Sequence, residues 1–217
     1  MRNNLSQLIS LSKIEEKLYR PADAYELSRV TRMEHVKTTI VETPQEGIAA
    51  VAARIAQLIN RREANGQKTV LSLASGRSMR DLFVELVRLH KEEGLSFKNV
   101  VVFGSYEFYP LSDTTSGSMA QIQSQLLEHV DILPENVHTF PGDLPKEDVF
   151  AFCEEYEKAI VEAGGIDVQV LGIGQCGNIA MNEPGTQPNS STRLVIMDGN
   201  SRVDVKSLFG NVAQVPT

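Results

Sequence analysis

From Thr38 onward, short runs of apolar and β-branched residues alternate with longer amphipathic segments. The apolar runs have the length of strands and cover residues 38–42, 69–74, 99–105, 136–140, 166–174 and 193–198. The amphipathic segments have the length of helices and cover residues 44–66, 79–94, 118–130 and 146–165. Because a helix that connects two strands allows them to pair in parallel, this alternation predicts the α/β class: a three-layer, doubly wound, mostly parallel sheet with helices on both faces.

The chain is long enough to form such a domain without a metal or a disulfide. It has 217 residues, and a domain of this size buries roughly 70% of the surface of its unfolded chain. We therefore expect one α/β domain over residues 37–217. Residues 1–36 show no alternating pattern and are expected to form an N-terminal arm.

Composition excludes several classes of protein. The net charge of −7 offers no basic surface to nucleic acid or to an anionic membrane. Two cysteines, Cys153 and Cys176, are too few for a disulfide framework or a cysteine metal cluster. No secretory leader and no apolar run of membrane-spanning length occurs. We expect a soluble cytoplasmic protein without a metal or another cofactor.

The fold class directs attention to the loops that follow the strands. Open parallel sheets bind ligands beyond the carboxyl ends of their strands. Three of these loops have unusual sequences, at residues 75–78, 105–113 and 175–190.

The first loop, Ser75-Gly76-Arg77-Ser78, joins a strand directly to a helix. Free N–H groups of a first helical turn, together with the helix dipole and two hydroxyls, form a favourable site for a phosphate. Glycine would let the backbone approach the ligand, and the arginine would add a charge-assisted contact. The structural alternative is that the serines cap the helix and the glycine makes the turn.

Three glycines, Gly172, Gly174 and Gly177, span the junction between the expected strand 166–174 and the third loop, in the G-x-G-x-x-G spacing of a dinucleotide-binding turn. Asp198 follows at a suitable distance, but no long helix follows Gly177, and such a turn should open one. The polar side chains of this loop instead suit a polyhydroxylated ligand. Alternatively, they satisfy only the backbone of a glycine-rich turn.

Several ordered blocks of the sequence resemble the glucosamine-6-phosphate deaminase/isomerase family, which shares its fold with the 6-phosphogluconolactonases. The blocks are VLSLASGRS, NVVVF with EFYPL, EHVDILPENVHTF, GGIDVQVLGIG, GNIAMNEPGT, STRLVIMD and QVP. They extend over about residues 37–216. The resemblance implies an aminosugar phosphate as the small-molecule ligand, bound at its phosphate by Ser75, Gly76, Arg77, Ser78 and Arg193.

The family reaction converts glucosamine 6-phosphate and water into fructose 6-phosphate and ammonia, and the resemblance implies five catalytic positions. Tyr106 stands where the family has the aspartate that removes the proton from carbon 2, with Glu107 beside it. Cys176 and Asn178 stand where the family has an aspartate and the ring-opening histidine, and Glu183 is unchanged. A phenol is a weak base at neutral pH, and an amide cannot transfer a proton.

Two functions therefore compete. The first is a glucosamine-6-phosphate deaminase of amino-sugar metabolism. The second is a non-catalytic module that binds a sugar phosphate or docks onto another enzyme domain. A protein with a phosphate-binding site but no catalytic base can bind the sugar phosphate without converting it. Lactone hydrolysis, as in the phosphogluconolactonases, is disfavoured because Asn178 replaces the histidine it requires.

The end of the sequence completes these expectations. The resemblance implies a further strand and helix after Pro216, including a lysine that helps to hold the phosphate. We expect either that the domain is truncated at its C-terminus or that the site is completed by a homo-oligomer or by a fused or associated second enzyme domain.

Overall fold

The computed structural model describes residues 23–25 and 38–216. The chain divides into two units, Met1–Val41 and Glu42–Thr217, and the second unit carries the sheet. The expected N-terminal arm lies outside the described residues except for residues 23–25.

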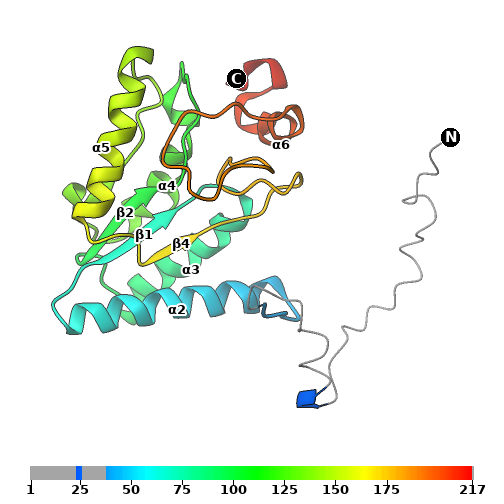
Figure 1. The fold of residues 1–217 in the computed structure, drawn as a ribbon. Helices are drawn as coiled ribbons and strands as arrows, with labels where there is room; N and C mark the ends of the chain where they lie inside the picture. The colour runs from blue at the N-terminus through cyan, green and yellow to red at the C-terminus, as the bar shows by residue number, and fades with distance from the viewer. Residues whose placement is uncertain (1–22, 26–37, 217) are drawn as a thin grey trace. The chain divides into compact units, whose positions relative to one another are not determined.

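The sheet has four parallel strands in the order β3-β2-β1-β4 (Figure 1). Their bounds are β1 Thr69–Leu73, β2 Val100–Gly104, β3 Val137–His138 and β4 Val168–Val170. The chain adds β2 and β3 on one side of β1 and then crosses to add β4 on the other side. The strand order therefore reverses between β1 and β4, and the prediction of a doubly wound sheet is confirmed.

Helices cover both faces of the sheet (Figure 1). Their bounds are α2 Pro44–Ala64, α3 Arg77–Glu93, α4 Ser118–Gln125, α5 Val149–Glu162 and α6 Gly199–Phe209. Apolar residues of α2, α3 and α4 pack with Leu71, Leu73 and Val102 on one face. Tyr156 of α5 packs with Val70 on the other face. Because successive strand residues point to opposite faces, helices on both faces bury both sets of side chains, and β1 and β2 are buried at every position.

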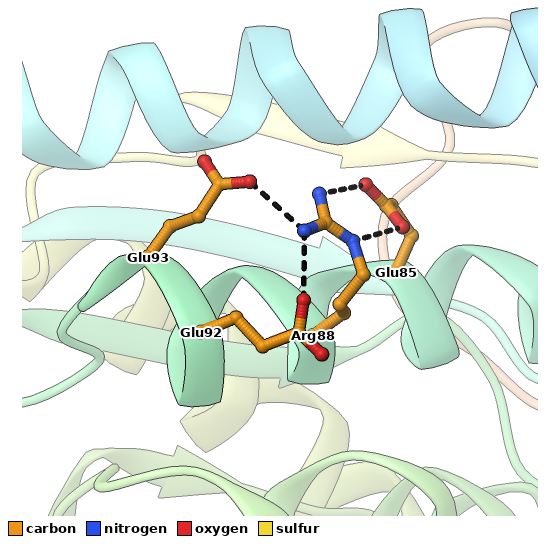
Figure 2. Close-up of polar contacts among 4 residues, drawn as sticks. All are labelled: Glu85, Arg88, Glu92 and Glu93. Carbon is orange, nitrogen blue, oxygen red and sulfur yellow. Dashed lines mark hydrogen bonds and ion pairs between the residues drawn. The ribbon is translucent and has the colours of Figure 1, made fainter.

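Helix α3 connects β1 to β2 and shows why the sequence pattern was informative. Its buried residues recur at three- and four-residue spacing, and they are Met79, Leu82, Phe83, Leu86 and Leu89. The helix ends at Gly94, which has a φ of 75°, a left-handed conformation that glycine adopts without steric cost. Arg88 of α3 lies among three glutamates of the same helix (Figure 2).

Four carboxylate contacts surround that arginine (Figure 2). Its guanidinium donates two hydrogen bonds to Glu85, at 2.7 and 2.9 Å, and lies 3.2 Å from Glu92 and 2.9 Å from Glu93. The hydrogen bonds from Arg88 hold the pKa of Glu85 below its ordinary value. Since these side chains are partly exposed, water and salt screen the pairs, and each contributes little to stability.

Two expected strands are wrong. Residues 38–42 join no β-ladder in the described part of the chain. They lead into the N-terminus of α2, where Thr43 accepts a hydrogen bond from the N–H of Glu46 at 3.2 Å and Glu46 accepts one from the N–H of Glu42 at 3.1 Å. This reciprocal cap engages the backbone N–H of Glu42, the last residue of the expected strand.

Residues 193–198 are also without a β-ladder in the described region. Their flanks are held by side chains of other elements: Thr192 bonds to Glu157 of α5, and the N–H of Asp198 donates to Glu183 at 3.0 Å. Ile196 is 82% exposed, so the apolar alternation of this segment does not reflect burial in a sheet. Among the described helices, none has both the length and the apolar character needed to cross a membrane.

Candidate functional site

The carboxyl ends of β1 and β4 flank the point where the strand order reverses. In open α/β sheets, ligands bind in the crevice that forms there. The loop after β1 contains the predicted phosphate-binding residues, and the glycine-rich loop follows β4. Gly172 lies beside α3, since a Cβ on it would be 4.0 Å from the side chain of Met79.

The first loop leaves the start of α3 open. Ser75 is buried, whereas Gly76, Arg77 and Ser78 are exposed. Gly76 is the N-cap with a φ of 134°, and among the described residues no side chain caps the helix. The alternative that serines cap α3 is therefore not observed. An uncapped helical N-terminus presents N–H donors and the positive end of the helix dipole to an anion.

Tyr106 extends from the end of β2 to this loop. Its hydroxyl lies 2.9 Å from the Ser75 hydroxyl and donates to the Ser75 carbonyl at 3.2 Å. Burial raises the pKa of Tyr106 above its ordinary value, against the lowering effect of hydrogen bonding. At neutral pH the side chain is therefore a phenol, and its hydroxyl links the loop after β2 to the loop after β1.

Glu107 points at the N-terminus of α4. One carboxylate oxygen accepts hydrogen bonds from the N–H groups of Ser118 at 2.7 Å and Phe108 at 2.8 Å, and the other accepts one from Met119 at 2.9 Å. A Cβ on Gly117, the helix cap, would lie 2.8 Å from this carboxylate. Burial raises the pKa of Glu107, although the three N–H donors oppose that shift. These contacts make the carboxylate a helix cap.

The glycine-rich loop folds into a small hairpin. Isolated bridges pair Ile173 with Ile179 and Ile179 with Asn182. Asn178 turns back on the loop, because a Cβ on Gly174 would lie 2.0 Å from its side-chain oxygen. The sequence pattern of a dinucleotide turn thus has a local structural cause: Gly174 makes room for Asn178.

A cavity of about 690 Å³ lies beside this hairpin. Tyr106, Glu107, Glu183 and Arg193 all contribute to its wall, together with aromatic residues between β2 and α5. Cys176 and Asn178 are half-buried but are not among the lining residues, and neither are residues 75–78. The structure therefore brings four of the predicted residues to one cavity, with Ser75 linked to it through Tyr106.

Arg193 and Glu183 occupy the same side of the cavity. The Arg193 guanidinium donates to the Ser190 hydroxyl at 2.7 Å, to the Ser191 carbonyl at 3.2 Å and to the Asn182 side-chain oxygen at 3.2 Å. Glu183 accepts the Asp198 N–H with one oxygen, and its other oxygen is buried without a hydrogen-bond partner in the described part of the chain.

Sequence reasoning missed Glu157 and Thr192, which also line the cavity. Thr192 immediately precedes Arg193 in a block that the resemblance had marked. Glu157 carried no signal, because it is one of several glutamates on an amphipathic helix.

Fold and site together define an α/β protein with an uncapped helix start beyond the carboxyl end of β1 and a cavity that is linked to this loop through Tyr106. Residues 42–204 match the family described as glucosamine-6-phosphate isomerases/6-phosphogluconolactonase. The chain belongs to this family.

Relatives and solved structures agree. A glucosamine-6-phosphate deaminase-like protein of Bacteroides thetaiotaomicron is 43% identical over the whole chain, which spans only 33% of that protein's length. A glucosamine-6-phosphate deaminase of Bacillus pumilus is 38% identical over 75% of this chain and 67% of its own. The structure of a monomeric glucosamine-6-phosphate deaminase is similar with a TM-score of 0.75 and 31% identity, over 84% of this chain and 73% of that one. A 6-phosphogluconolactonase from Trypanosoma brucei, at 23% identity and a TM-score of 0.56 over 72% of this chain and 67% of that one, shares the fold.

Proposed function

We propose that the chain binds an aminosugar phosphate at the carboxyl edge of the sheet and does so without efficient deamination. Membership of the family and the resemblance of the loops to family motifs support the ligand class. Physical support comes from the uncapped start of α3 and from the Arg193 guanidinium at the cavity wall. In a protein of net charge −7, such local positive groups are needed to attract an anion.

The observation that carries the second half of the proposal is the state of Tyr106. Removing the proton from carbon 2 requires a base near its operating pH. Even at the ordinary phenol pKa near 10, only about one molecule in a thousand is ionised at pH 7, and burial raises the pKa of Tyr106 further. Glu107 cannot take over without releasing the N–H groups that it accepts at the start of α4.

Deamination of glucosamine 6-phosphate is the second candidate, and Glu183 favours it. Its unpartnered buried oxygen belongs to a residue of the cavity wall, where a substrate hydroxyl could satisfy it. Relatives named as deaminases support the same reaction. In this case the protein would act in amino-sugar metabolism.

Two measurements on the same preparation separate these functions. Calorimetric titration with glucosamine 6-phosphate should show binding, and Arg193→Ala should weaken it by about 1.5–3 kcal/mol, the range for hydrogen bonds to charged groups. Ammonia release should remain at the buffer background. Tyr106→Asp combined with Asn178→His should then restore release. Turnover by the unaltered chain would establish the deaminase instead, and absence of binding would refute both functions.

Three further expectations stay proposals. The acidic charge disfavours nucleic acid and anionic membranes as partners. A cytoplasmic location fits sugar-phosphate metabolism. Completion of the site by a second copy or by an associated enzyme domain can be tested by measuring the mass of the protein in solution.

A further inference from the structure

One carboxylate of α5 holds the residue that precedes Arg193. Glu157 accepts hydrogen bonds from the Thr192 N–H at 2.6 Å and from the Thr192 hydroxyl at 2.7 Å, both with the same oxygen. Glu157 is half-buried and lines the cavity. Glu154 and Glu155, on the same helix, are exposed. Glu157 therefore differs from its neighbours in having a defined partner 35 residues away.

The segment that carries Arg193 is held at its far end by the hydrogen bond from the Asp198 N–H to Glu183, but few contacts fix its beginning. Residues 193–198 form neither helix nor strand, and two of the three contacts of the Arg193 guanidinium are to nearby Ser190 and Ser191. Contacts within one loop do not fix that loop relative to the sheet. The Glu157–Thr192 pair does so, because α5 is packed on the sheet.

Helix α5 is a firm support. The hydroxyl of Tyr156, the residue before Glu157, donates to the carbonyl of Gly104 in β2 at 2.9 Å. The Tyr156 ring stacks on Phe140 with 4.1 Å between centroids and meets Phe103 edge-on at 5.4 Å. Glu157 thus follows directly from a buried anchor between helix and sheet.

We propose that Glu157 is a positioning residue for phosphate recognition: through Thr192 it fixes the backbone from which Arg193 reaches the anion. This inference deepens the proposed function and rests on it. Ordering a loop and its arginine during binding costs affinity, and a loop that is already held avoids that cost. The carboxylate acts through Thr192 and does not itself touch the ligand.

Charge allows this positioning to be distinguished from a direct effect. A carboxylate on the wall of an anion-binding cavity repels the anion, so removing its charge alone should strengthen binding. Losing the hydrogen bonds should weaken binding. Glu157→Gln removes the charge and keeps a side-chain oxygen that can accept both bonds, whereas Glu157→Ala removes the charge and the bonds together.

The test is a set of calorimetric titrations of the full chain with glucosamine 6-phosphate. We expect Glu157→Ala to raise the Kd about 3- to 10-fold, the cost of ordering one or two side chains. Glu157→Gln should leave the Kd unchanged or lower it. Glu154→Ala and Glu155→Ala, which each remove a carboxylate of the same helix, serve as controls and should bind as the wild type does.

A double-mutant cycle with Arg193→Ala decides whether the effect passes through the arginine. In that background Glu157→Ala should change the Kd no further. Hydrogen exchange of the Thr192 amide should accelerate in Glu157→Ala, although urea unfolding should show the domain folded. Equal Kd values for Glu157→Ala and Glu157→Gln, when Arg193→Ala weakens binding, overturn the positioning role and leave the proposed function standing. If Glu157→Ala raises the Kd by the same factor in the wild-type and Arg193→Ala backgrounds, the positioning role is also overturned. If the wild type does not bind the sugar phosphate, the proposed function and this inference both fail.

Discussion

The hairpin beside the cavity contains two residues in a backbone conformation that is sterically unfavourable for any residue with a Cβ atom. Ala180 and Met181 have φ values of 47° and 61° and form the two-residue turn between Ile179 and Asn182. Backbone hydrogen bonds of 2.8 and 3.0 Å close this turn. A left-handed conformation costs an L-residue about 1–2 kcal/mol, and glycine avoids this cost.

Ala180→Gly should therefore stabilise the domain. Relief of about 1–2 kcal/mol is offset by about 0.5–1 kcal/mol of extra chain entropy that glycine gives the unfolded state. We expect a net gain of about 0–1.5 kcal/mol in the free energy of unfolding, as the difference of those two ranges. Urea denaturation at constant pH and salt, with a common m-value, measures it.

Ala53→Gly is a matched control, because Ala53 is exposed in the interior of α2. The same chemical change should there cost about 1 kcal/mol. The two variants should consequently move the urea midpoint in opposite directions. Equal destabilisation by both would show that the turn is not strained and would refute the reasoning.

The remaining predictions concern side-chain contacts outside the cavity wall. Asp131 accepts a hydrogen bond from the Phe97 N–H at 2.5 Å; burial alone would raise the pKa of Asp131, but its hydrogen bonds outweigh that effect and lower it. Ionised Asp131 therefore stabilises the folded state above the ordinary aspartate pKa, and this stabilisation is lost as the pH falls through the lowered pKa of the folded state. In Asp131→Asn the free energy of unfolding, measured by urea denaturation at a series of pH values, should fall less steeply towards acid pH. Arg88→Ala should reduce stability by no more than about 1 kcal/mol and less in high salt, and a larger, salt-independent loss would show that the pairs are not screened. Gly174→Ala should destabilise by about 1 kcal/mol by displacing the Asn178 side chain, a cost that should disappear in an Asn178→Ala background measured by thermal melting.

Much of the fold could be predicted from the sequence, because the buried apolar residues occur in short runs in the strands and at helical spacing in the helices. The runs at β1 and β2 are mostly apolar and are buried at every position, and the apolar stripe of α3 faces the core. Segment 193–198 has a comparable apolar pattern but no ladder, since strand formation depends on a neighbour that the pattern does not specify. Residues 38–42 also form no ladder in the described part of the chain, and the backbone at their end is engaged in the reciprocal cap of α2.

The candidate site was less predictable, because its geometry depends on contacts across the sheet. Resemblance identified Tyr106 and Arg193, and both line the cavity. It gave no indication that Tyr106 is bonded to Ser75 or that Asn178 turns towards Gly174. Glu157 could not be found at all, since its partner lies 35 residues away in a segment without regular structure.

The cap that Glu107 provides for α4 bears on how such a protein can change over time. Three backbone donors depend on this carboxylate, so a substitution there would disturb the fold whether or not any reaction took place. Its neighbour Tyr106 caps no helix in the described part of the chain and bonds to the loop at Ser75, so it is less constrained by folding than Glu107. Two adjacent codons would then be under different kinds of selection, one for folding and one for chemistry. Retention of an acidic residue that looks catalytic is thus no evidence that catalysis has been retained.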